Sequence, residues 1–294
     1  MVIGIGETVL DIIFRDNQPQ TAVPGGSTFN AIISLGRMGV DCAIVTEVGD
    51  DHVGDITCKY LRDNHVSDLY VCRHIGSKSH ISLAFLDENN DAHYQFYKDH
   101  AHAHLQVNTP AFQEQDIVLF GSFFAINPVI RETVYSLLQA AKRAGAILYY
   151  DINFRKAHMV DIPDVIGNIC ENMRLSDVVR GSVEDFEYLY GTRDIETIYH
   201  THIAPYCKNW ICTRGGEKII LRTPTIQTEF AVPPIHTIST IGAGDNFNAG
   251  FIYELMKLKH LPFTIEEWAS LIATGQCFAQ NVCQQWGNSV RLEK

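Results

Sequence analysis

The segment 240–250, Thr-Ile-Gly-Ala-Gly-Asp-Asn-Phe-Asn-Ala-Gly, has the residue types of a site for phosphoryl chemistry. Two glycines permit a tight turn that exposes backbone N–H groups, and the apolar residues that follow have helical spacing. Amides at a helix N-terminus favour an anion. This anion site would be formed by the amides of Ile241, Gly242, Ala243 and Gly244. Asp245 would repel a bound phosphate, but it is suited to take a proton from a hydroxyl that attacks phosphorus, so we expect phosphoryl transfer to an alcohol.

Other functions of a Gly-x-Gly segment must be weighed against this one. Such a segment before a helix is also common as an ordinary turn between a strand and a helix. A Walker A loop is excluded, because no Gly-x4-Gly in the chain is followed by Lys and Ser or Thr. A dinucleotide-binding Gly-x-Gly-x-x-Gly is excluded as well. Phe247 stands at the position of its third glycine, as does Val9 after Gly4-Ile-Gly6.

Composition narrows the class of protein. The chain has 294 residues, 46% of them hydrophobic and 19% charged, which is ordinary for a globular enzyme with one large α/β domain or two smaller ones. The net charge of −11 argues against nucleic acid or an anionic membrane as the main partner, and no apolar run is long enough to cross a bilayer. The eight cysteines form no Cys-x-x-Cys pair, so we expect reduced core residues of a cytoplasmic protein. The first residues favour a strand and not a signal peptide.

Short apolar runs alternate with segments of helical period, which predicts βα units and a mainly parallel sheet. The expected strands are 2–6, 42–48, 117–120, 146–150, 177–180, 210–213 and 218–222. The expected helices are 27–38, 54–64, 129–144 and one that starts at Asp245. Residues 69–99 interrupt this rhythm with a β-rich composition and a hairpin turn at 87–91. With residues 11–22 they predict a small sheet that projects from the main one.

A second motif supplies groups that suit a sugar. Asp11 follows the first strand, and Gly25-Gly-Ser-Thr-Phe-Asn30 opens the next helix, ahead of Leu35-Gly36. Carboxylates and amides bind hydroxyls in pairs, and glycine brings the backbone close. Together with Gly-Ala-Gly-Asp, this Gly-Gly-x-x-x-Asn pattern resembles the ribokinase-like (PfkB-type) carbohydrate kinases. The resemblance runs over nearly the whole chain.

The resemblance implies a fold and a reaction. The fold would be a ribokinase-like three-layer α/β domain over 1–294, with a mainly parallel central sheet. A small β-sheet lid, formed by about 11–22 and 69–100, would close over the sugar and exclude water. The reaction would be transfer of the γ-phosphate of MgATP to a sugar hydroxyl, with Asp245 as the base. The residues that would hold the sugar are Asp11, Gly25, Gly26 and Asn30.

A third motif bears on the substrate. In Asp151-Ile-Asn153-Phe-Arg155, alternation along an extended segment would point the polar residues to one side, although a salt-bridged loop has the same composition. Asp-x-Asn-x-Arg and Phe120-Gly-Ser resemble fructokinases, and the first also resembles 2-keto-3-deoxygluconate kinases. The resemblance implies that Arg155 contacts substrate or neutralises phosphate charge. Fructose is the favoured substrate, with 2-keto-3-deoxygluconate, ribose or a nucleoside as alternatives.

The nucleotide and ion sites depart from the family pattern. Ser182 and Asp185 occupy the places of its Asn-x-x-Glu, which organises Mg²⁺ and water, so we expect Asp185 to reach the ion through water. Thr213-Arg-Gly215 resembles the Thr-x-Gly contact to ATP. Ser239 replaces an Asp that supports a monovalent cation, and a neutral hydroxyl binds K⁺ less well. Potassium activation is therefore not implied.

Further interpretations stay open. The departures at Ser182 and Ser239 allow a degenerate kinase that binds sugar as a sensor. A nicotinamide-dependent oxidoreductase would need the dinucleotide motif that the chain lacks. His100, His102 and His104 alternate as metal ligands on a strand would, but a solvated segment fits them better. The edges of a lid sheet could pair two chains into a homodimer.

Overall fold

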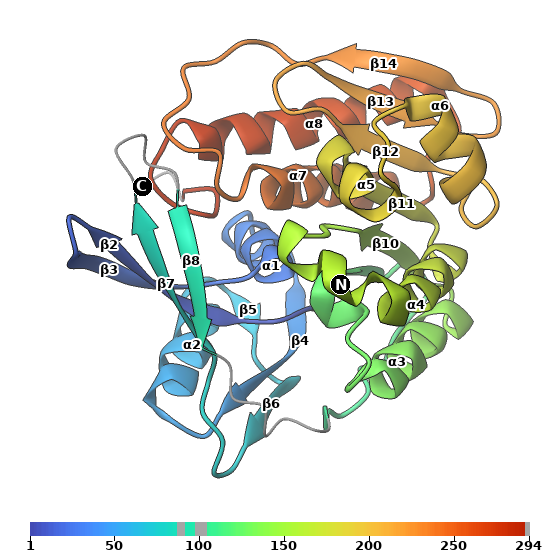
Figure 1. The fold of residues 1–294 in the computed structure, drawn as a ribbon. Helices are drawn as coiled ribbons and strands as arrows, with labels where there is room; N and C mark the ends of the chain where they lie inside the picture. Colours follow the sequence, from blue (N-terminus) through green and yellow to red (C-terminus); the bar gives the residue numbers. More distant parts are fainter. Residues whose placement is uncertain (87–91, 98–104, 292–294) are drawn as a thin grey trace.

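The computed structural model describes residues 1–86, 92–97 and 105–291 (Figure 1). Among these residues a large sheet of ten strands forms the centre of the molecule. Its strands are β1 (Val2–Ile5), β4 (Cys42–Gly49), β5 (Val66–Ser67), β6 (Val71–His74), β9 (Ile117–Gly121), β10 (Ile147–Asp151), β11 (Val178–Ser182), β12 (Trp210–Thr213), β13 (Lys218–Arg222) and β14 (Gln227–Ala231). The hairpin turn expected at 87–91 and the histidines at 100, 102 and 104 lie outside the described residues.

The order of the strands is that of βα units. It runs β14-β13-β12-β11-β10-β9-β1-β4-β5, with β6 paired to β4. The strand pairs are parallel from β6 and β5 through to β12, and β13 and β14 join antiparallel at the far edge. A parallel sheet is covered on both faces, which explains why β1, β4 and β9 are buried along their whole length. The expected strands of this sheet are present, with ends displaced by a residue or two.

Helices cover both faces of the large sheet, so the molecule has three layers (Figure 1). The helices are α1 (Ser27–Arg37), α2 (His52–Asp63), α3 (Arg131–Arg143), α4 (Ile162–Leu175), α5 (Val183–Tyr190), α6 (Ile195–Thr197), α7 (Ala243–Leu258) and α8 (Ile265–Cys283). Buried side chains of α1, α7 and α8 form one apolar core with one face of the sheet, and those of α3, α4 and α5 form a second core with the other. Consecutive strand residues divide between the two, Tyr149 entering the first core and Tyr150 the second.

A smaller sheet projects from the large one (Figure 1). Its strands are β2 (Val9–Arg15), β3 (Gln18–Gly25), β7 (Ile81–Leu86) and β8 (Ala92–Tyr97), in the order β3-β2-β7-β8. The predicted segment 69–100 was assigned too broadly, because β6 pairs with β4 in the large sheet and the side chain of Cys72 enters the core there. The small sheet therefore contains two antiparallel strand pairs, β2 with β3 before α1 in the sequence and β7 with β8 after β6.

Two expectations from composition can be compared with the structure. All eight cysteines are unpaired, and six are buried, but Cys277 is exposed on α8 and Cys170 is half-buried. Among the described residues, no helix is both long enough and apolar enough to cross a bilayer.

Candidate active site

The turn before α7 forms because of its first glycine. Gly242 has a φ of 77°, and a Cβ there would stand 2.8 Å from the carbonyl oxygen of Asn288, so both conformation and space require glycine. The amide of Ile241 donates to Oγ of Ser239 at 3.2 Å, and that of Ala243 donates to the carbonyl of Thr240 at 3.2 Å.

Other amides of this turn stay available. In the part of the chain that the structure describes, the backbone N–H groups of Gly242 and Gly244 donate to no protein acceptor. Unpaired amides at a helix N-terminus are donors for an anion, and the helix dipole adds to their attraction. Half of the amides predicted for the anion site are thus engaged within the turn, and the other half are free to bind.

Asp245 lies in the first turn of α7 and is held by α1. Oγ of Ser27 donates to one carboxylate oxygen at 2.8 Å, and Nδ2 of Asn30 donates to the other at 2.9 Å. The side chain is buried, and burial raises the pKa of this carboxyl above its ordinary value. Three interactions oppose this increase in the pKa: the hydrogen bond from Asn30, the positive charge of Arg155 and the hydrogen bond from Ser27. Asp245 is therefore oriented by two donors at the end of α7 that attracts an anion.

The two glycines before α1 are required for different reasons. Gly26 has a φ of 131°, and a Cβ there would lie 2.3 Å from the carbonyl oxygen of Glu7. At Gly25, the last residue of β3, a Cβ would stand 2.8 Å from Oδ2 of Asp11. The Gly-Gly sequence thus lets β3 pass close to β2 and then turn into α1.

Asp11 is the residue by which the small sheet contributes to the site. It lies on β2 and is 8% exposed, and the hydroxyl of Ser82 on the neighbouring strand β7 donates to its Oδ1. Burial raises the pKa of Asp11 to about 6, with the negative charge of Glu7 adding to the rise and the bond from Ser82 opposing it. The structure therefore places the predicted sugar-binding residues Asp11, Gly25 and Asn30 beside one another, and Asn30 joins them to Asp245.

A buried ion pair supports the first turn of α7. The guanidinium of Arg180, in the middle of β11, donates to Oδ1 of Asp151 at 3.0 Å and to Oγ1 of Thr213 at 2.8 Å. Asn248 of α7 donates to the other oxygen of Asp151 at 2.7 Å. A Cβ on Gly244 would stand 3.0 Å from both terminal nitrogens of Arg180, so the guanidinium packs against the turn itself. Residues of three adjacent strands, β10, β11 and β12, are thereby joined to α7.

The Asp-x-Asn-x-Arg segment has a different shape from the extended one expected. β10 ends at Asp151, and Asn153 has a φ of 37°, so alternation does not continue through Arg155. Ile152 and Phe154 are buried in the core, and Arg155 is exposed. The positive charge of Arg155 lowers the pKa of both Asp245 and Asp185, so it acts on both carboxyl groups. Asp151 is in the buried ion pair described above and not in a surface salt bridge.

Ser182 and Asp185 form a capping box at the start of α5. The amide of Asp185 donates to Oγ of Ser182 at 3.2 Å, and the amide of Ser182 donates to Oδ2 of Asp185 at 2.6 Å. Asp185 is 5% exposed, and burial together with the charge of Asp151 raises its pKa to about 6. Among the described residues no three His, Cys, Asp or Glu side chains are grouped to hold a metal ion. Mg²⁺ needs few protein ligands when it arrives on a nucleotide, so a single carboxylate that reaches the ion through water fits this ion.

The last predicted nucleotide contacts lie on one hairpin. Thr213 ends β12 and accepts the bond from Arg180. Gly215 lies in the exposed turn that leads to β13, with a φ of 52° and open space where a Cβ would be. Thr213 is thus joined to the centre of the site, and Gly215 stands apart from it.

The sequence did not indicate several residues that complete the site. Ser27 was inside the glycine motif but was given no role. Ser82, Arg180 and Asn248 reach the site from β7, from β11 and from the second turn of α7. The distance along α7 from Asp245 to Asn248 is a helical i, i+3 step, and this was the one signal in the sequence that pointed to any of them.

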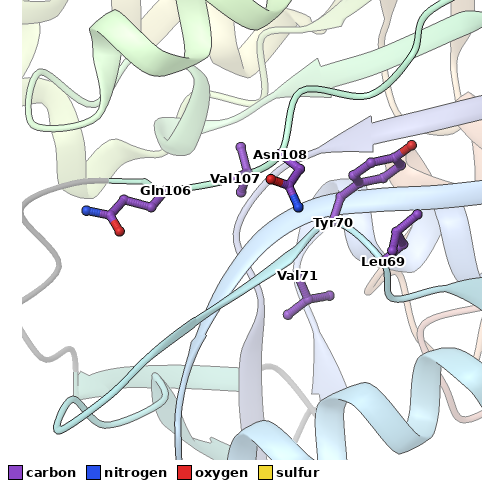
Figure 2. A pocket seen from close by; sticks show the side chains of 6 residues that line it. All are labelled: Leu69, Tyr70, Val71, Gln106, Val107 and Asn108. Carbon is purple, nitrogen blue, oxygen red and sulfur yellow. The ribbon is translucent and has the colours of Figure 1, made fainter.

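A cavity of about 420 Å³ lies away from these residues. Leu69, Tyr70 and Val71 line it on one side, and Gln106, Val107 and Asn108 on the other (Figure 2). The lining includes no charged side chain and none of the predicted site residues. This cavity is therefore not the site assembled around Asp245.

Comparison with known proteins gives a family to this fold and site. Residues 2–293 match the model of the pfkB family carbohydrate kinases. Fructokinase-1 of Oryza sativa subsp. japonica is 24% identical over 269 residues, which cover 87% of this chain and 83% of that protein. A 5-dehydro-2-deoxygluconokinase of Geobacillus thermodenitrificans is 25% identical over 262 residues, which cover 85% of this chain and 77% of that protein.

A solved structure supports the same fold. The fructokinase of Vibrio cholerae O395, in a form with bound fructose, ADP and calcium ion, superposes with a TM-score of 0.87 at 23% identity. The match covers 99% of this chain and 95% of that one. The chain belongs to the pfkB family of carbohydrate kinases and is a sugar kinase of an ATP-dependent family. The ribokinase-like three-layer fold expected from the sequence is confirmed.

Proposed function

We propose that this sugar kinase phosphorylates fructose and that Asp245 is its general base. The observation that carries the assignment is the position of Asp245, held by Ser27 and Asn30 beside the free amides of Gly242 and Gly244. Asp245 accepts the proton of a sugar hydroxyl while the hydroxyl oxygen forms its bond to the γ-phosphorus of ATP. The bond from that phosphorus to the bridging oxygen breaks, and ADP leaves with the electron pair.

The glycine turn 241–244 stabilises the charge that builds on the transferred group. Fixed amides aimed at a developing charge are worth more than the same donors in water, because they need no reorganisation during the step. Gly242 and Gly244 supply the donors, and Ile241 and Ala243 keep the turn in shape through their own bonds. Arg155, which is exposed and whose charge lowers the pKa of Asp245, neutralises phosphate charge or contacts the sugar.

The sugar lies at the junction of the two sheets in this proposal. Asp11, Gly25, Gly26 and Asn30 surround it, and Asp11 and Asn30 bind its hydroxyls. The small sheet acts as a lid that excludes water and so limits hydrolysis of ATP.

The nucleotide lies along the ends of β11 and β12. Ser182, Thr213 and Gly215 contact it, with Thr213 fixed by Arg180 and Gly215 leaving room for the ligand. Mg²⁺ binds with the phosphates, and Asp185 contacts it through water because one of its oxygens already caps α5. The ion supplies positive charge beside the phosphoryl group that is transferred.

Fructose is favoured by the Asp-x-Asn-x-Arg and Phe-Gly-Ser segments and by the fructokinases among the relatives. A 5-dehydro-2-deoxygluconokinase with comparable identity keeps a sugar-acid kinase as the second candidate. Ribose and nucleosides are the remaining candidate substrates. We further propose a cytoplasmic enzyme that does not depend on K⁺, since Ser239 uses its hydroxyl to hold the turn, and that forms a homodimer through the lid.

The test is ADP release with MgATP against a panel of sugars, with and without K⁺. Turnover on fructose in preference to 2-keto-3-deoxygluconate, ribose and nucleosides supports the whole proposal. Preference for another sugar overturns the assignment of fructose but does not contradict the proposed mechanism. A strong requirement for K⁺ contradicts the role given to Ser239. No turnover on any sugar that the protein binds would favour a sensor.

A further inference from the structure

Three polar atoms surround the space above Gly25. A methyl group placed on Gly25 would stand 2.8 Å from Oδ2 of Asp11 and 3.7 Å from Oδ1 of Asn30. It would stand 3.6 Å from Nδ2 of Asn288, a half-buried residue that follows α8. Within the described part of the chain, none of these three atoms has a hydrogen-bond partner, although the other polar atoms of Asp11 and Asn30 are engaged. Two acceptors and one donor thus meet at one point and are free.

A hydroxyl group matches these three atoms. It donates one hydrogen bond and accepts others, so it satisfies a carboxylate or amide oxygen and an amide nitrogen at once. A carboxylate would be repelled by Asp11, and an ammonium group would leave the donor of Asn288 without an acceptor. The side-chain amide of Asn288 therefore completes a site for a polyol hydroxyl that Asp11 and Asn30 form from the other sides.

The backbone around Asn288 is fixed in a way that orients its side chain. Its carbonyl oxygen accepts from Nδ2 of Asn246 on α7 at 2.8 Å. The next two residues are tied to α1, where Oγ of Ser289 donates to the carbonyl of Asn30 at 3.2 Å and the amide of Val290 donates to Oγ of Ser34 at 3.0 Å. The segment is thus held by both helices that carry the site, so little conformational freedom remains to be lost when a ligand binds.

We propose that Asn288 is a sugar-binding residue, whose amide donates to a sugar hydroxyl that in turn donates its one hydrogen to Asp11 or Asn30. The proposal rests on the sugar kinase function proposed above and adds a specificity determinant to it. Asn288 contributes its side chain to the sugar and its backbone carbonyl to the glycine turn, so the two roles can be separated by substitution.

The experiment compares Asn288→Ala and Asn288→Asp with the wild-type enzyme and with Gln284→Ala. Gln284 is an exposed residue at the end of α8 and provides a matched control on the same segment. Sugar affinity is measured by calorimetry without nucleotide, using the sugar that the panel identifies, and circular dichroism verifies that each variant is folded. The same proteins are then assayed with monodeoxy analogues of that sugar.

Loss of one neutral hydrogen bond predicts an affinity about three- to tenfold weaker for Asn288→Ala, with the KM for ATP unchanged. Asn288→Asp keeps the shape and replaces the donor by a charge beside Asp11, so it weakens binding further. One monodeoxy analogue, which lacks the hydroxyl that Asn288 contacts, should bind the wild-type enzyme more weakly than the parent sugar does. The same analogue should bind the wild-type enzyme and Asn288→Ala with almost equal affinity. Wild-type sugar affinity in both folded variants overturns the proposal. Failure of the wild-type enzyme to act on any sugar overturns the proposed function instead.

Discussion

The side-chain amide of Asn30 in α1 donates to the carboxylate of Asp245 in α7 over 2.9 Å. These residues come from two separate sequence motifs, one predicted to bind the sugar and the other the phosphoryl group. One amide therefore joins the two halves of the site. Its remaining oxygen, Oδ1, points to the space above Gly25, so the same residue can orient the base and bind the substrate.

Asp245→Asn removes the general base and keeps the size of the side chain. We expect kcat to fall by ~10²–10⁴, because this is the usual contribution of a positioned base. Sugar affinity, measured by calorimetry, should stay within a small factor of wild type, since Asp11 and the glycines are untouched. An unchanged kcat would exclude Asp245 as the base.

Ser27→Ala tests whether the protonation state of the Asp245 carboxyl limits the rate. The hydroxyl of Ser27 lowers the pKa of Asp245, so its removal raises that pKa. The base works as a carboxylate, and the rate falls as pH decreases through its pKa. The acid limb of the kcat profile should therefore move to higher pH. Ser34→Ala is the control, because Ser34 is also on α1 but donates to Asn246. Equal profiles in all three proteins would contradict this role for Ser27.

Asp11 predicts a pH dependence of sugar binding. Its pKa is raised to about 6, so a growing fraction is protonated as pH falls below that value and one acceptor for the sugar is lost. The KM for the sugar should rise between about pH 7 and pH 5, while Asp11→Asn should have a weak affinity that varies little over this range. Ser82→Ala should move the increase in KM to higher pH, because the bond from Ser82 lowers the pKa. A KM that is constant from pH 7 to pH 5 in wild type would refute the assignment.

Arg180→Met should strongly destabilise the fold. It leaves the buried carboxylate of Asp151 without its partner, and breaking such a pair by removing one member typically costs about 3–5 kcal/mol. Urea unfolding measures the loss. The double variant Arg180→Met, Asp151→Asn should recover part of it, because no unpaired buried charge remains. If the single and double variants lose the same stability, the charge of Asp151 is not what makes Arg180 necessary.

Arg180→Lys separates charge from shape. A lysine keeps the positive charge but cannot bond Asp151 and Thr213 with one planar group while it packs on Gly244. We expect a lower kcat with little change in sugar affinity, since the first turn of α7 loses its support. Thr213→Val provides the control for loss of the second bond alone.

Local patterns predicted most strands of the large sheet and the glycine turns for physical reasons, but α4, α5 and α8 were not among the expected helices. Burial on both faces produces the continuous apolar strands, and a left-handed residue such as Gly242 is marked by glycine itself. The family was visible in this way, and so was Asn30, one of the two residues that hold Asp245. The extent of the small sheet was predicted less well, because β6 has the same composition as lid strands and its pairing with β4 depends on tertiary contacts.

Contacts between distant segments could not be predicted. Ser82 is 71 residues from Asp11, and nothing in its own neighbourhood distinguishes it from other strand serines. Asn288 follows the last long helix in a segment with no recognisable motif. The turn at Asn153 was mistaken for extended chain, because a positive φ at asparagine leaves no mark in an alternating sequence.

Asp11 belongs to the small sheet, whereas Asp245 is held by residues of α1. β2, which carries it, is bonded on both sides by β3 and β7, so Asp11 and Ser82 move together whenever that sheet moves. A sugar that binds Asp11 and Asn30 at once binds best to the arrangement in which the sheets are close. The measured affinity then equals the intrinsic affinity multiplied by the fraction of molecules in that arrangement. Substitutions in the small sheet far from the sugar will therefore change the apparent affinity by changing this fraction, without touching the ligand.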